Sequence, residues 1–142
     1  MKEIKGNLWT QPSEAIIAVT TNGIVDKFQR LVMGRGCAQE AAALCPNLPR
    51  ILGKLVADQG NHAHYVSEYN IVSFPTKNHW RDNSDIELIR QSAREVVYLA
   101  DQHGWTSVII PRPGTGYGRL QWPDVKKVLE GILDDRFSII TF

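Results

Sequence analysis

The sequence predicts an α/β protein, a three-layer αβα sandwich with a central mixed sheet. Short aliphatic runs alternate along the whole chain with segments whose apolar residues recur at helical spacing. Several of these runs are apolar throughout, which is typical of central strands covered on both faces. The 142 residues match the size of one domain, so we expect a single domain over 1–142.

Six segments carry the aliphatic pattern expected of strands. They are residues 2–8, 15–20, 63–66, 71–74, 107–110 and 138–142.

Four segments carry the pattern expected of helices. Ser84 and Glu87 form a capping box that opens the clearest helix, and Gly104 ends it. A second helix has Pro123 in its first turn, and a third covers 37–45. The fourth, over 48–59, is interrupted in the sequence by a glycine at position 53.

Composition excludes several classes of protein. The chain has 16 basic and 15 acidic side chains, a net charge of +1, so no overall field favours nucleic acid or membranes. It has no apolar run long enough for a signal peptide or a membrane span. Cys37 and Cys45 lack Cys-x-x-Cys spacing and suit a reducing compartment. We expect a cytoplasmic monomer with no membrane partner.

Two glycine-rich segments each lead toward a helix. The first is MGRGCA (33–38), and its glycines leave backbone N–H groups unobstructed at a helix start, where the dipole favours an anion. The second is PRPGTGYGRLQW (111–122), where Gly114, Gly116 and Gly118 allow positive φ angles that form an anion-binding nest. Together the two segments suit a diphosphate, although glycine also marks plain turns. Walker and Rossmann spacings are absent, since Arg119 stands where the latter needs a glycine.

Two further clusters contain side chains of types that can bind a ligand. His62 and His64 would point to one face of a strand, but no third metal ligand follows at credible spacing, so we expect no metal and no cofactor. His79, Trp80 and Arg81, beside Lys77, combine cations with a ring. That mixture can bind a single nucleic-acid strand or form the rim of a sugar pocket. Without a wider basic face the sequence does not favour stand-alone nucleic-acid binding, although a nucleic acid could carry the ligand.

The order of motifs resembles the macrodomain family over nearly the whole chain. The motifs are GNLW (6–9), AVTTNG (18–23), MGRGCA, SFPTKNHWR (73–81) and PRPGTGYGRLQW. The sequence looks most like two groups of ADP-ribosyl hydrolases: antitoxin macrodomains that remove ADP-ribose from thymidine in DNA, and terminal ADP-ribose glycohydrolases that act on protein carboxylate esters.

The resemblance implies a set of ADP-ribose contacts. Asn7 matches a family aspartate that accepts a hydrogen bond from adenine, and Asn22 matches the asparagine near the distal ribose. Phe142 either stacks on adenine or packs in the core. The expected binding residues are Asn7, Leu8, Thr21, Met33, Gly34, Arg35, Gly36, Cys37, Ala38, Pro113, Gly114, Thr115, Gly116, Tyr117, Gly118, Arg119 and Phe142.

Lys77 matches the lysine that both hydrolase groups place beside the distal ribose, so the resemblance implies that Lys77 and Asn22 are catalytic. An amine there can stabilise a leaving oxygen or attack an opened ribose. The alternative is a solvated surface lysine.

Gly118 departs from the protein-ester hydrolases, which carry an aspartate there, whereas the DNA-directed group commonly has glycine. Asp82 and Asp85 are nearby carboxylates but are more simply residues of a helix start. The sequence therefore favours an ADP-ribosyl glycohydrolase, with DNA preferred over protein as carrier. A non-catalytic reader of ADP-ribose and a hydrolase of ADP-ribose 1″-phosphate remain as alternatives.

Overall fold

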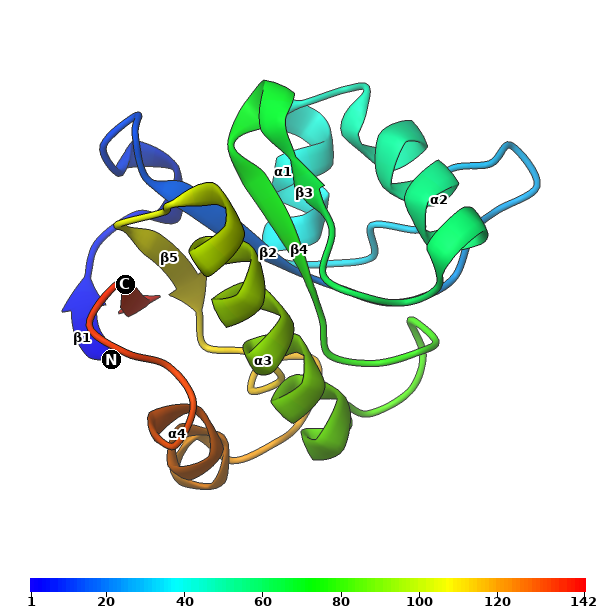
Figure 1. Cartoon of the computed structure of the whole chain (residues 1–142). Helices are drawn as coiled ribbons and strands as arrows, with labels where there is room; N and C mark the ends of the chain where they lie inside the picture. The colour runs from blue at the N-terminus through cyan, green and yellow to red at the C-terminus, as the bar shows by residue number, and fades with distance from the viewer.

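A computed structural model describes all residues, 1–142, as a six-stranded sheet between two layers of helices (Figure 1). The sheet order is β1-β6-β5-β2-β4-β3. The strands are β1 Lys2–Lys5, β2 Ile16–Thr21, β3 Tyr65–Val66, β4 Ile71–Pro75, β5 Val108–Pro111 and β6 Phe137–Thr141. Every pairing is parallel except that of β3 with β4, so the predicted mixed sheet and layered α/β class are confirmed.

The helices lie on opposite faces of the sheet in pairs (Figure 1). On one face, α1 (Cys37–Leu44) and α2 (Leu48–Gln59) bury Ala41 and Leu52 with Val19 of β2. On the other, α3 (Ile86–His103) and α4 (Trp122–Glu130) bury Val96 and Leu129 with Phe74 of β4 and Ile110 of β5. The strands β2, β4, β5 and β6 bury alternate side chains on the two faces of the sheet, which explains the apolar runs in the sequence.

Two expected strands are shorter than the sequence suggested. The first ends at Lys5, because Gly6 adopts a φ of 153° and Asn7 then caps a short 3₁₀ helix, Leu8–Thr10. The third begins at Tyr65, so His62 and His64 precede the strand instead of lying on it. Their side chains have separate partners: His62 Nδ1 lies 2.7 Å from Glu95 Oε2, and His64 Nε2 lies 3.0 Å from the carbonyl oxygen of Gly60.

The predicted capping box at Ser84 is wrong by one residue. Asp85 caps α3, with its carboxylate accepting from the N–H of Glu87 at 2.9 Å. The Ser84 side chain turns inward and is buried. Asp85 thus stands at the start of a helix, as the sequence indicated.

Gly53 does not interrupt α2, which runs over the expected range of 48–59. A Cβ atom at Gly53 would overlap the carbonyl oxygen of Gln29 and lie 2.8 Å from the N–H nitrogen of Leu31. The glycine therefore lets the segment between β2 and α1 lie against the helix.

Both cysteines are free thiols. None of the helices has the combination of length and apolarity that crossing a lipid bilayer demands.

Candidate anion-binding site at the carboxyl edge of the sheet

The residues singled out by the sequence follow the carboxyl ends of parallel strands, so they gather at one edge of the sheet. β2 and β5 are neighbours, yet the chain after β2 leads to α1 on one face and the chain after β5 leads to α4 on the other. In open α/β sheets this divergence leaves a crevice between the two connections, and ligands bind there. The two glycine segments lie at this point.

The first glycine segment presents the start of α1 without a side-chain cap. Gly34 and Gly36 have φ angles of 55° and 66°, and Gly36 is the N-cap residue. The first N–H groups of a helix have no partner within it and carry its positive dipole end. A Cβ atom at Gly36 would meet nothing within 4 Å, so this backbone is open.

The neighbours of those glycines divide into buried and exposed groups. Met33, which precedes α1, and Ala38, in its first turn, are both buried in the core. Either residue could contact a ligand only through its main chain. Burial raises the pKa of the Cys37 thiol despite its place at the helix start, and its sulfur lies 3.2 Å from the hydroxyl of Thr20. Arg35 is exposed.

The second glycine segment folds into a tight loop with its own hydrogen bonds. The N–H of Leu120 donates to the carbonyl of Gly114 at 2.9 Å, and the N–H of Arg119 donates to that of Gly116 at 3.1 Å. Gly114 has a φ of 76°, but Gly116 and Gly118 do not have positive φ, and Arg119 does, at 64°. The expectation of three left-handed glycines is therefore wrong for two of them.

Gly118 is required by packing rather than by its φ angle. A Cβ atom there would overlap the Oγ of Ser84 and lie 2.6 Å from the carbonyl oxygen of Gly114. The Ser84 N–H donates to the carbonyl of Gly118 at 2.9 Å, which joins this loop to the start of α3. Pro113 is also buried, while Thr115 is half-buried and donates to the carbonyl of Arg112 at 3.3 Å.

The two glycine segments contact each other. The guanidinium carbon of Arg35 lies 5.0 Å from the centre of the Tyr117 ring, in a cation–π arrangement. Both side chains are exposed. The structure thus brings together two loops that are some eighty residues apart in the sequence, as a shared anion site demands.

Asn22 has a structural role that the sequence did not indicate. Its side chain is 4% exposed; its Nδ2 donates to the carbonyl of Val32 at 2.8 Å, and its Oδ1 accepts from the N–H of Ile24 at 2.9 Å. These bonds tie the two ends of the loop that leads to Gly34. Thr21, also buried, accepts from the N–H of Thr76 through its carbonyl at 3.0 Å.

Lys77 lies directly after β4, beside the loop that follows β2. Its Nζ donates to the carbonyl of Asp82 at 3.3 Å, and the side chain is half-buried. Its own carbonyl accepts from Asn61 Nδ2 at 3.2 Å, while the N–H of Gly23 donates to the carbonyl of Asn78 at 3.1 Å. The segment that contains Lys77 is therefore hydrogen-bonded to the segment that contains Asn22.

The remaining predicted contacts lie after β1 and β6, which are paired. The Oδ1 of Asn7 already accepts from the N–H of Trp9 at 2.8 Å, and Leu8 is buried against Ile140. Phe142 is 94% exposed, which rules out the alternative that it packs in the core.

Sequence reasoning missed two side chains of this edge, Ser84 and Asn61. Each has a buried oxygen, Ser84 Oγ and Asn61 Oδ1, without a hydrogen-bond partner. Ser84 supports the second glycine loop, and Asn61 packs within 3 Å of where a Cβ atom of Gly23 would lie. Neither stands in a motif, so only their tertiary neighbours identify them.

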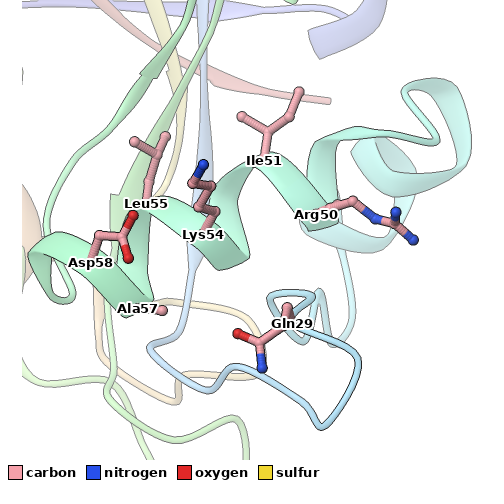
Figure 2. Close-up of a pocket in the computed structure, with 7 residues that line it drawn as sticks. All are labelled: Gln29, Arg50, Ile51, Lys54, Leu55, Ala57 and Asp58. Carbon is pink, nitrogen blue, oxygen red and sulfur yellow. The ribbon is translucent and has the colours of Figure 1, made fainter.

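An open surface groove also exists elsewhere, on the outer side of α2 (Figure 2). Its lining includes Gln29, Ile51, Lys54 and Leu55, and none of the predicted site residues. Its walls carry the cations of Arg50 and Lys54 but no glycine loop. We therefore place the candidate site on the carboxyl edge.

The sequences of several known proteins align with most of this chain. A DNA ADP-ribosyl glycohydrolase of Thermus aquaticus is 30% identical in an alignment 139 residues long that covers 94% of this chain. One of Mycobacterium tuberculosis is 30% identical over 131 residues. The chain spans 38% and 36% of the length of these relatives.

Solved structures share the fold. The macrodomain of Thermus aquaticus DarG superimposes with a TM-score of 0.81 at 24% identity, covering 99% of this chain and 97% of that one. Thermosipho africanus DarTG, solved in complex with ADP-ribose, gives 0.80 at 20% identity and covers 98% of this chain and 41% of that one. The sequence model of the Macro domain family matches residues 29–129, which include both glycine segments and Lys77. This chain belongs to the Macro domain family.

Proposed function

We propose that this protein binds ADP-ribose at the carboxyl edge of the sheet, with the diphosphate between the two glycine loops. The contact of Arg35 with Tyr117 carries the proposal, because it shows that the loops meet at the point where the sheet connections diverge. The open backbone at Gly36 and Gly116 supports it, since no side chain obstructs a phosphate there. Phosphate oxygens would accept from main-chain N–H groups of both loops.

We further propose that the protein is an ADP-ribosyl glycohydrolase and that DNA is its preferred carrier over protein. The names of the relatives support this, as does the packing of Gly118, which leaves no room for the aspartate of the protein-ester hydrolases. In the reaction, the bond between the anomeric carbon and the carrier breaks. The oxygen of a water molecule joins that carbon, and the carrier takes up a proton.

Lys77 is the proposed catalytic residue, and Asn22 orients the distal ribose. An ammonium group beside the anomeric centre favours departure of the carrier by stabilising the charge that develops on it. The hydrogen bonds of Asn22 to Val32 and Ile24 fix its amide, and its remaining N–H is the group proposed to face the ribose. The amine of Lys77 makes just one hydrogen bond, to the carbonyl of Asp82, and can exchange it for one to the substrate.

A non-catalytic reader is the second candidate, favoured by the absence of a carboxylate at position 118. Hydrolysis of ADP-ribose 1″-phosphate is the third. Time courses with ADP-ribosylated DNA, ADP-ribosylated protein and ADP-ribose 1″-phosphate separate the three. We expect release from DNA above all; a reader releases ADP-ribose from none of them.

Lys77→Ala tests the assigned role. We expect turnover on ADP-ribosylated DNA to fall at least a hundredfold, while calorimetric titration shows ADP-ribose binding within a few-fold of the unaltered protein. Lys54→Ala, at an exposed lysine of α2, is the matched control and should leave both unchanged. Selective binding of ADP-ribose over AMP and NAD is expected; its absence would refute the ligand itself.

A further inference from the structure

Asn61 stands in the link between α2 and β3, outside every motif of the sequence. Figure 1 shows this link, in green, passing the point where β4 ends. Both N–H groups of the Asn61 amide are used there. Nδ2 donates to the carbonyl of Lys77 at 3.2 Å and to Oδ1 of Asn78 at 3.0 Å. One side chain therefore holds both the main chain at Lys77 and the side chain that follows it.

The same amide packs against the segment that contains Asn22. Gly23 has no positive φ that would require glycine, but a Cβ atom there would lie 2.8 Å from Asn61 Nδ2. The N–H of Gly23 also donates to the carbonyl of Asn78 at 3.1 Å. The missing side chain at Gly23 thus lets Asn61 reach the junction of the segments that follow β2 and β4.

The link is held to α3 immediately after Asn61. The carboxylate of Glu95 accepts from the N–H of Ala63 at 2.9 Å, and its other oxygen lies 2.7 Å from Nδ1 of His62. Val96, the next residue of α3, is fully buried in the core. Because α3 is anchored in this way, Asn61 extends from a fixed support.

We propose that Asn61 is a positioning residue, which sets where the ammonium group of Lys77 lies relative to the distal ribose. A lysine side chain is long and flexible, so the place that its nitrogen reaches depends on where its main chain is held. Lys77 Nζ makes one hydrogen bond, to the carbonyl of Asp82 at 3.3 Å. When the amine exchanges that bond for one to the substrate, the support of the main chain remains. The inference rests on the proposed function, because it takes Lys77 as the catalytic residue.

The oxygen of the Asn61 amide indicates that stability alone does not explain the residue. Oδ1 is buried and has no hydrogen-bond partner within the protein. Burying an amide oxygen without a hydrogen bond is costly, and this cost offsets part of the gain from the two N–H bonds. Loss of the amide should therefore reduce turnover more than it reduces stability.

Steady-state kinetics on ADP-ribosylated DNA provide the first test. Asn61→Ala should lower kcat about tenfold or more, because a displacement of about 1 Å at a reacting group is costly. KM, and the calorimetric affinity for free ADP-ribose, should stay within about threefold. Asn78→Ala, which removes one of the two acceptors, should lower kcat less. Asn47→Ala is the matched control, because Asn47 is exposed and its side chain does not cap α2.

Gly23→Ala disturbs the same contact from the other side. The added methyl group would lie 2.8 Å from Asn61 Nδ2 and displace the amide, so kcat should fall as in Asn61→Ala. The double variant should lose little more than either single variant, since removal of the amide makes room for the methyl group. Losses that multiply would overturn the inference, by showing that the two changes act independently.

Amide hydrogen exchange measures the support without catalysis. In Asn61→Ala the N–H of Gly23, which is bonded to the carbonyl of Asn78, should exchange at least about fivefold faster. The N–H of Val108, which donates to the carbonyl of Arg136 in the core of the sheet, should exchange at an unchanged rate. Equal acceleration at both positions would overturn the inference, because it would indicate general destabilisation. If Asn61→Ala does not fold, Asn78→Ala and Gly23→Ala carry the same measurements.

The outcomes separate this inference from the proposed function. If the unaltered protein releases nothing from ADP-ribosylated DNA while exchange at Gly23 responds to Asn61→Ala, the proposed function is wrong and the support of the Lys77 segment stands. If the unaltered protein turns over and Asn61→Ala has the same kcat, the inference is wrong. It is also wrong if Asn61→Ala loses affinity for ADP-ribose alone, or if Asn47→Ala loses as much turnover.

Discussion

The hydroxyl of Ser84 occupies the space in which a side chain at Gly118 would begin. Ser84 is buried, its Oγ has no hydrogen-bond partner, and its N–H donates to the carbonyl of Gly118 at 2.9 Å. The second glycine loop therefore packs against the start of α3 and is hydrogen-bonded to it. The absence of a carboxylate at position 118 follows from this packing.

Gly118→Ala should destabilise the protein by about 1–3 kcal/mol, because the added methyl group overlaps Ser84 and crowds the carbonyl of Gly114. ADP-ribose affinity should fall about tenfold or more as the loop shifts. Urea unfolding and calorimetry measure the two effects. Gly116→Ala is the control, since nothing lies within 4 Å of the added atom and the φ angle is not positive. Equal behaviour of the two variants would refute the packing role of Gly118.

Asn22→Asp should cost about 1–3 kcal/mol at neutral pH, because a carboxylate replaces the donor to the Val32 carbonyl and carries charge into a buried site. The buried acid should have a pKa raised above its unfolded value. Its protonated form can donate to Val32, so the loss is smallest below the unfolded pKa and grows as pH rises through the folded one. Denaturant unfolding at pH 4 and pH 8 measures this. The exposed residue Asn83, changed to Asp, should show no such loss.

Gly53→Ala should lower the free energy of unfolding by about 1–3 kcal/mol, although alanine is the better helix former. The methyl group would displace the segment around Gln29 from α2. Thermal unfolding provides the measurement. Gly131→Ala, at the end of α4 with a φ of −77° and its nearest contact at 3.6 Å, should be neutral or stabilising. A stabilised Gly53→Ala protein would contradict the close approach.

Asp134, in the turn before β6, should contribute to the stability of the protein against acid. Its side-chain hydrogen bond from Arg136, 2.7 Å between Nη2 and Oδ2, lowers its pKa below the ordinary value of 3.8. A lowered pKa gives stability that is present above the unfolded pKa and is lost as pH falls through the folded one. The difference in urea midpoint between the unaltered protein and Asp134→Asn should therefore be clear at pH 6 and shrink below about pH 3.8. Asp58→Asn, at an exposed and unpaired carboxylate, should show no comparable trend.

The sequence predicted the layered class, the number of strands and the range of α2, because buried parallel strands and amphipathic helices leave strong apolar patterns. It predicted less well where tertiary contacts override local signals. Ser84 looked like a helix cap yet packs beneath a distant loop, and nothing in the sequence indicated that Asn22 holds two main-chain groups. Gly118 was expected to need a left-handed backbone, but its neighbour Arg119 adopts it instead.

Placing the two glycine loops on adjacent strands from distant parts of the chain has a consequence for assembly. A fragment ending after α2 would contain one wall of the crevice, and a fragment starting at α3 would contain the other. Neither fragment alone would contain both loops of the proposed diphosphate site, so the site would form only when the central strands pair. A nucleotide that binds only the complete site stabilises the folded protein. It should therefore protect the protein from proteases increasingly as the nucleotide concentration rises.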